Sequence, residues 1–114
     1  MKQHLSGLKK ALELSGGTHT LEDMAEQVRT GKSQVWSTEN ACIVTEINDT
    51  PRKRVLHFWL ATGDLDAVRE LSESVLVWGK QQGCDMATLI GRRGWDKAAP
   101  ERWTPVMTVM TRGL

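Results

Sequence analysis

The sequence contains no tyrosine, only two cysteines and three prolines, and no long hydrophobic run. Cys42 and Cys84 lie far apart and belong to no CxxC motif or Cys/His cluster, so we expect neither a disulfide framework nor a metal site. No apolar stretch approaches the roughly 20 residues that a transmembrane helix requires, and the first residues lack the apolar core of a signal peptide. These absences predict a protein of a reducing compartment that has no membrane span.

Neither sign of charge dominates the chain. Fifteen basic and fourteen acidic side chains leave a net charge of +1. That balance excludes a strongly cationic protein that coats nucleic acid, and it excludes an acidic tail protein. With 114 residues, of which 39% are hydrophobic, the chain has the size of one domain. A domain of this size can bury about two thirds of its unfolded surface, so we expect a single domain over residues 1–114 with its own core.

Hydrophobic periodicity divides the chain into helices and strands. Helical spacing marks residues 2–14 and a second helix from Thr20, whose hydroxyl is expected to form a capping box with Asp23. The longest helical pattern covers residues 64–83 and ends at a glycine. Strands are predicted at 34–36, 41–47, 55–60, 86–90 and 105–110, and a short helix at 95–98. The first three strands form a meander, and the long helix then crosses over to the fourth. This order predicts an α+β fold with three α/β/α layers, in which a mixed, mostly antiparallel sheet has helices on both faces.

Three short segments carry a resemblance to a known family. They are Pro51-Arg52-Lys53-Arg54, residues 59–65 with the sequence WLATGDL, and residues 91–95 with the sequence GRRGW. Together with the order of elements, they resemble the GNAT-type N-acyltransferase fold, with the helix of residues 1–17 in place of the family's first strand. The closer likeness is to small GNAT-like proteins of tailed phages and prophages. That resemblance implies a location in the virion or the host cytoplasm and, as partners, other phage structural proteins or a second copy of the chain.

The resemblance also implies where an acyl donor would bind. GNAT enzymes hold the pyrophosphate of acetyl-CoA on backbone amides of a Q/R-x-x-G-x-G/A loop at the start of the long helix. Only one glycine is in register here, because leucines at positions 60 and 65 occupy the other two specified positions. The carboxylates of Asp64 and Asp66 would also repel the incoming phosphates. We therefore expect no cofactor; in an active enzyme, Thr62 and Gly63 would be the residues that bind acetyl-CoA.

Catalytic residues are equally sparse. Members of the family often use a glutamate on the meander as general base and a tyrosine as the acid for the leaving thiolate, and this chain has no tyrosine. Trp95 lies near that position, but an indole N–H is no acid at neutral pH. Glu46 and His57 lie on predicted strands and are the candidate catalytic residues of an active acetyl-CoA-dependent N-acyltransferase. We favour the alternatives, a solvated glutamate and a core or edge histidine with one hydrogen bond.

Two basic loops are candidate partner-binding sites. Arg92 and Arg93 stand between glycines and close to Trp95, and Arg52 and Arg54 occupy a predicted hairpin tip. Such residues can bind carboxylates or phosphates, with the tryptophan as a flat anchor, although solvated turns have the same composition. The sequence thus predicts a degenerate, non-enzymatic GNAT-like protein that acts through protein contacts in the phage virion or during its assembly. The alternatives are an active acyltransferase and a weak nucleic-acid-binding module.

Overall fold

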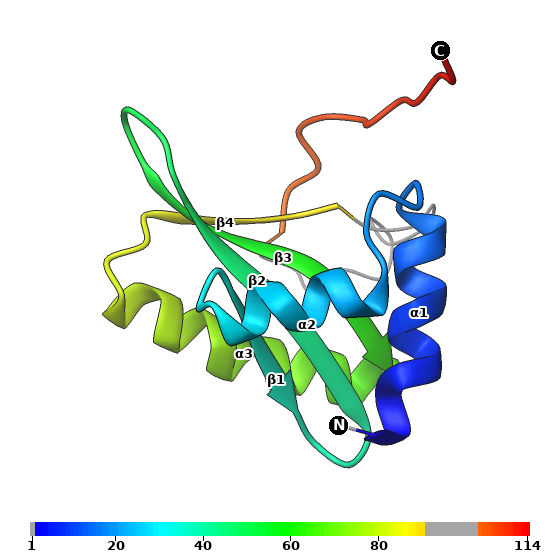
Figure 1. The fold of residues 1–114 in the computed structure, drawn as a ribbon. Coiled ribbons are helices and arrows are strands. Elements are labelled where there is room, and N and C mark those ends of the chain that lie inside the picture. The colour runs from blue at the N-terminus through cyan, green and yellow to red at the C-terminus, as the bar shows by residue number, and fades with distance from the viewer. Residues whose placement is uncertain (1, 91–102) are drawn as a thin grey trace.

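The computed structural model describes residues 2–90 and 103–114 (Figure 1). A 3-10 turn, Lys2–His4, leads into α1 (Leu5–Leu14), and α2 follows at Leu21–Arg29. Three strands come next: β1 (Ser33–Ser37), β2 (Ala41–Asp49) and β3 (Arg54–Gly63). The long helix α3 (Leu65–Gln81) then leads to β4 (Met86–Leu89). The helices and strands predicted up to residue 90 are confirmed in kind and in order.

The four strands form one sheet in the order β1-β2-β3-β4. β1, β2 and β3 pair antiparallel as a meander, whereas β4 runs parallel to β3 after the α3 crossover. Helices α1 and α2 cover one face of the sheet and α3 covers the other (Figure 1). The core accordingly has two halves, with the buried residues Leu8, Leu12, Met24, Cys42, Val44 and Leu60 in one and Ala41, Ile43, Leu56, Phe58, Val68 and Val75 in the other. The expected three-layer α+β fold with a mixed sheet is confirmed.

Local sequence explains where the helices begin and end. The Asp23 amide donates to the Thr20 hydroxyl at 3.1 Å, and the Thr20 amide donates to the Asp23 carboxylate at 2.8 Å. This capping box satisfies backbone amides that the first turn of α2 cannot pair. The bond from the Thr20 amide also holds the pKa of Asp23 below its ordinary value. After α2 and α3, Gly31 and Gly83 each adopt a φ of +83°, which stops both helices.

A β-bulge in β3 reorganises the middle of the sheet. Trp59 has no partner in β2, because its neighbours Phe58 and Leu60 pair with consecutive residues of that strand. A bulge bends its strand and increases the local twist. Phe58 therefore faces α3, whereas Trp59 and Leu60 both pack toward α1 and α2. Pairing with β4 stops at the same place, since Phe58 and Leu89 form the last pair.

The C-terminal part of the chain departs from the prediction. The strand predicted over residues 105–110 is wrong: residues 103–114 contain no strand, because no neighbouring strand pairs with them and their side chains from residue 104 onward are exposed. The short helix predicted at 95–98 lies outside the described residues. Within the part of the chain that the structure describes, no helix has the length and apolar character to cross a membrane.

Candidate functional site

A cleft lies where β4 ends and β3 continues past the bulge. Their parallel pairing covers only residues 55–58 of β3 and 86–89 of β4, while β3 continues to Gly63 paired with β2 alone. A cavity of about 160 Å³ lies beside the end of β4. Its walls come from α1, β3, α3 and β4 and are largely apolar, with Ala11, Leu14, Phe58, Trp59, Val68 and Leu89 among the lining residues. The cleft thus lies next to the part of β3 that β4 does not pair with.

Trp103 closes part of this cleft. Its ring meets Phe58 edge to face, with the ring centroids 5.6 Å apart and an interplanar angle of 83°. Trp103 is half-buried, whereas the residues that follow it are exposed. Edge-to-face aromatic pairs contribute about 0.5–1.5 kcal/mol beyond the burial of area. Trp103 is therefore the point at which the C-terminal segment is attached to the domain.

A row of polar side chains crosses three strands of the sheet. Glu46 of β2, His57 of β3 and Thr88 of β4 are cross-strand neighbours. The His57 Nδ1 is hydrogen-bonded to the Thr88 hydroxyl at 2.8 Å. Because His57 lies between Leu56 and Phe58, which face α3, the row lies on the face that α1 and α2 share. The structure brings the two candidate catalytic residues next to each other and adds a third polar side chain.

The protonation of His57 follows from its surroundings. Burial lowers the pKa of the imidazole, because the charged form loses its hydration. The Glu46 carboxylate and a hydrogen bond to the Thr88 backbone raise the pKa but do not outweigh burial. His57 is therefore neutral at pH 7.

A second histidine, His19, belongs to the same region. It lies in the connection between α1 and α2, where its Nδ1 is hydrogen-bonded to the Thr18 hydroxyl at 2.8 Å. Its ring meets Trp59 edge to face, with ring centroids 4.9 Å apart, and Trp59 also lines the cleft. Sequence reasoning missed His19, the bulged Trp59 and Thr88. A bulge has no fixed sequence signature, and the pairing of His57 with Thr88 depends on the register of β4 against β3.

The connection between β3 and α3 is one residue long. β3 ends at Gly63, α3 begins at Leu65, and only Asp64 lies between them. Gly63 pairs with Ala41, and the Asp64 amide donates to the Asn40 carbonyl at 2.9 Å. The chain is thus tied to the start of β2 up to the residue before the helix. This leaves no loop that could wrap around an anion.

The charged groups at this junction are mostly acidic. Asp64, the N-cap residue, makes no side-chain capping bond, and Asp66 lies in the first turn of α3. Arg69 forms an ion pair with Asp66 at 3.8 Å. Carboxylates near a helix N-terminus occupy the favourable field that an anionic ligand would otherwise meet. Thr62 and Gly63, the residues expected to hold acetyl-CoA in an active enzyme, both lie within the β2–β3 ladder.

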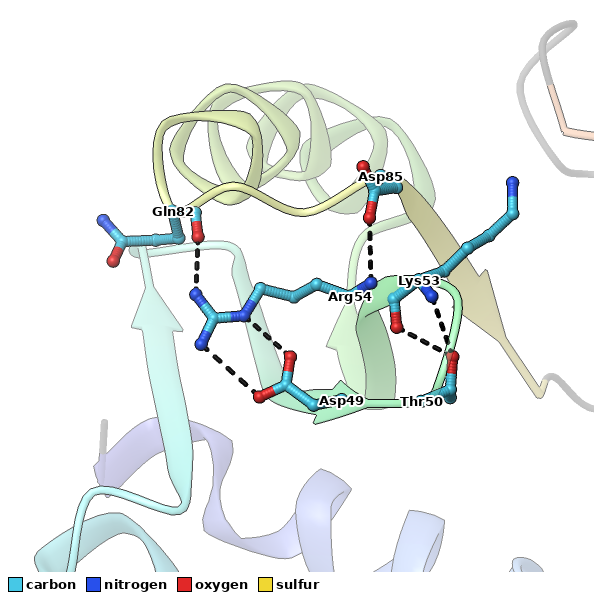
Figure 2. Close-up of polar contacts among 6 residues, drawn as sticks. All are labelled: Asp49, Thr50, Lys53, Arg54, Gln82 and Asp85. Carbon is cyan, nitrogen blue, oxygen red and sulfur yellow. Dashed lines mark hydrogen bonds and ion pairs between the residues drawn. The ribbon is translucent and has the colours of Figure 1, made fainter.

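Arg54 is built into the structure at the hairpin (Figure 2). Its Nε donates to the Asp49 carboxylate at 2.9 Å, and its Nη1 donates to the Gln82 carbonyl at 2.7 Å. Its backbone amide donates to the Asp85 carboxylate at 2.9 Å. The bond to Asp49 raises the pKa of the Arg54 guanidinium. These contacts join the β2–β3 hairpin to the connection between α3 and β4, so Arg54 has a structural role whatever else it binds.

The other basic candidates have fewer constraints in the structure. Arg52 lies exposed in the turn between β2 and β3. Arg92, Arg93 and Trp95 lie outside the described residues. Partner binding by these side chains, and weak binding of nucleic acid, therefore stay predictions. Among residues 2–90 and 103–114, no group of three or more His, Cys, Asp or Glu side chains could hold a metal ion.

Known proteins resemble this chain in structure rather than in sequence. No protein-family model matches the sequence, and no curated protein matches it either. Among solved structures, TTHA1254 from Thermus thermophilus is similar with a TM-score of 0.63 at 16% identity, over 100% of this chain and 95% of that chain. The aminoglycoside acetyltransferase meta-AAC0020 from an uncultured soil metagenomic sample, in complex with sisomicin, has a TM-score of 0.65 at 10% identity, over 98% of this chain and 88% of that chain. The ribosomal-protein-alanine N-acetyltransferase from Brucella melitensis biovar Abortus 2308 has a TM-score of 0.53 at 8% identity, over 95% and 94% of the two chains.

Identities this low show the fold and not the activity. In this chain, that fold consists of the antiparallel meander, the α3 crossover to a parallel strand and the helices on both faces of the sheet. The chain therefore has the fold of the GNAT-type acetyltransferases.

Proposed function

We propose that this protein is a catalytically degenerate GNAT-fold protein that acts through contacts with other proteins, as a component of a tailed-phage virion or a factor in its assembly. The proposal that the protein has lost catalysis rests on the junction of β3 and α3. Only Asp64 lies there, where an active enzyme would have a loop that binds the acyl donor. The virion role is supported by the sequence resemblance of residues 51–54, 59–65 and 91–95 to small GNAT-like phage proteins.

The junction disfavours acetyl-CoA in two ways. A pyrophosphate needs several converging backbone amides, which a glycine-rich loop ahead of a helix supplies. Here the Asp64 amide is already bonded to Asn40, and the carboxylates of Asp64 and Asp66 accompany the remaining amides of the first turn. Each like-charge contact at about 4 Å costs ~1–4 kcal/mol at surface dielectrics. A helix N-terminus typically contributes only about 0.3–1 kcal/mol to an anion, so repulsion outweighs attraction.

The proton chemistry is incomplete as well. His57 can accept a proton, but none of the 114 residues is a tyrosine. A departing thiolate would therefore lack the phenolic acid that the family often uses. A half-buried histidine that bonds to a threonine hydroxyl is also an ordinary way to satisfy a polar side chain in a sheet. We assign the row of Glu46, His57 and Thr88 this structural role.

Isothermal titration of the full chain with acetyl-CoA tests the degenerate part. We expect no binding under conditions that would detect a Kd of about 1 mM. The double variant Asp64→Asn, Asp66→Asn separates the two causes: binding gained by this variant identifies the charges, and no gain identifies the missing loop. Micromolar binding by the unchanged chain, together with acetyl transfer to an amine, would overturn the proposal.

The virion part has a separate test. Mass spectrometry of purified particles of the encoding virus, together with cross-linking of infected cells, would locate the protein. Presence in particles identifies a virion component, and cross-links to capsid or tail proteins without presence in particles identify an assembly factor. Finding the protein in neither fraction contradicts the role.

One observation favours an active N-acyltransferase as a second candidate. The cleft next to β3 is open and largely apolar, which suits the chain of an acyl thioester, and His57 directly precedes Phe58, which lines it. In this case Glu46 and His57 would deprotonate the amine, directly or through water. The double variant Glu46→Gln, His57→Gln would then lose transfer activity while remaining folded. Absence of transfer by the unchanged chain over a panel of amines would exclude this candidate.

A further inference from the structure

The cleft beside β3 is lined by apolar side chains from both sides of the sheet. Ala11 and Leu14 of α1 line it on one side, and Val68 of α3 lines it on the other. Its volume is about 160 Å³, whereas apolar cavities of about 150 Å³ engineered into other proteins stay dry and bind benzene or xenon. The cleft therefore has the size and the walls to hold one small apolar molecule.

Two hydroxyl groups in the lining are already used inside the protein. Ser15 donates its hydroxyl hydrogen to the Leu12 carbonyl at 3.0 Å, and Ser72 donates to the Arg69 carbonyl at 2.7 Å. Among the described residues, every buried side-chain nitrogen or oxygen atom has a hydrogen-bond partner. A buried water molecule needs about two to four polar partners. These walls thus favour an apolar ligand over ordered water.

The charge at the cleft is balanced. Arg69 is the charged residue among the described residues that line it, and its guanidinium forms an ion pair with Asp66 at 3.8 Å. A carboxylate ligand would compete with Asp66 for this guanidinium, and it would also lose hydration on entering an apolar site. An uncharged ligand meets neither cost.

Three aromatic rings line the cleft, and other rings pack against two of them. The three are Phe58, Trp59 and Trp103. Trp103 meets Phe58 edge to face, and His19 meets Trp59 in the same way from the connection between α1 and α2. Aromatic rings prefer edge-to-face and offset contacts with one another. Because side chains that are already held in place lose little freedom when a ligand binds, this arrangement favours an aromatic ligand.

We propose that the cleft binds an uncharged aromatic molecule with about one six-membered ring, without the nucleotide part of a coenzyme. The inference goes beyond the proposed function and does not rest on it, because it involves no residue of the junction between β3 and α3. It does not depend on what covers the cleft either, since fully enclosed apolar cavities of this size also admit benzene.

Titration of the full chain with toluene tests the inference. Tryptophan fluorescence reports binding, because Trp59 and Trp103 line the cleft, and amide NMR shifts locate it. We expect a Kd on the order of 0.1–1 mM. Ala11→Leu places a larger side chain in the cavity and should weaken binding at least about tenfold. Ala25→Leu is the matched control, because it makes the same change at an exposed position of α2, and it should leave binding unchanged.

A second variant and a second probe complete the test. Leu14 is 54% exposed, so Leu14→Ala removes an apolar wall of the cleft without opening the core, and it should weaken toluene binding at an unchanged melting temperature. Benzoate adds a carboxylate to the same ring and should bind at least about tenfold more weakly than toluene.

The outcomes separate this inference from the proposed function. Absence of toluene binding, binding that neither Ala11→Leu nor Leu14→Ala weakens, or benzoate binding as tight as that of toluene would each overturn the inference. None of these results bears on the loss of acyl transfer. Micromolar binding of acetyl-CoA would instead contradict the proposed function and leave the toluene result standing.

Discussion

Replacing Gly63 with alanine tests whether β3 runs into α3 without a loop. Gly63 has a φ of +121°, which L-residues rarely adopt. A Cβ at this position would collide with the Asn40 carbonyl oxygen and lie 2.7 Å from the Cα of Ala41. Both are backbone atoms at the start of β2, so they cannot move aside without breaking the pairing of the two strands. The substitution should therefore cost far more than the loss of a flexible residue.

Two contributions set the size of the effect. A non-glycine residue in a strained backbone region costs about 1–3 kcal/mol, and overpacking against immovable atoms costs about 1–3 kcal/mol more. Their sum, roughly 2–6 kcal/mol, is a large part of the ~5–15 kcal/mol by which domains are stable. Gly83→Ala is the matched control. Gly83 has a φ of +83° but nothing within 4 Å of a built Cβ, so only the backbone contribution applies.

Urea unfolding followed by tryptophan fluorescence measures both variants, since the chain has five tryptophans. We expect Gly63→Ala to be less stable than Gly83→Ala by at least about 1 kcal/mol. Equal destabilisation by the two substitutions would refute the close approach of β3 to the start of β2. The absence of a donor-binding loop would then lose its structural basis.

Two other substitutions test the hairpin contacts and the polar row. Arg54→Ala should lower the free energy of unfolding, because it removes the ion pair with Asp49 and the hydrogen bond to the Gln82 carbonyl. Arg52→Ala in the same turn should change it less, and equal effects in urea titrations would contradict the contacts of Figure 2. Burial lowers the pKa of His57 in the folded state, so the unfolded chain binds this proton more readily. The stability that this histidine contributes is present above the unfolded pKa of about 6.5 and is lost as the pH falls through the folded pKa. His57→Gln should flatten that part of the stability profile, and an unchanged slope between pH 7 and pH 5 would argue against a buried neutral imidazole.

Much of the fold is readable from local patterns. The capping box of Thr20 and Asp23 begins α2, and a glycine ends each of α2 and α3. These signals act within a few residues, so the sequence alone places both ends of α2 and the end of α3 closely. The meander and the crossover follow because consecutive elements usually pack next to each other and parallel strands need a helical connection. Glu46 and His57 could each be proposed as site residues from their type and position, but not as neighbours.

The sequence by itself determined the order and kind of the elements up to residue 90, the lack of a tyrosine acid, and the acidic residues that precede and open α3. Tertiary structure alone decided that Trp59 is bulged, that a cleft lies where β4 ends beside β3, and that His57 bonds to Thr88. It also decided that residues 105–110, for which the sequence predicted a strand, have no strand partner in the structure. Dihedral preferences and caps are local, whereas register, bulges and strand partners depend on segments brought together from afar. A strand forms only where another edge meets its unpaired amides and carbonyls.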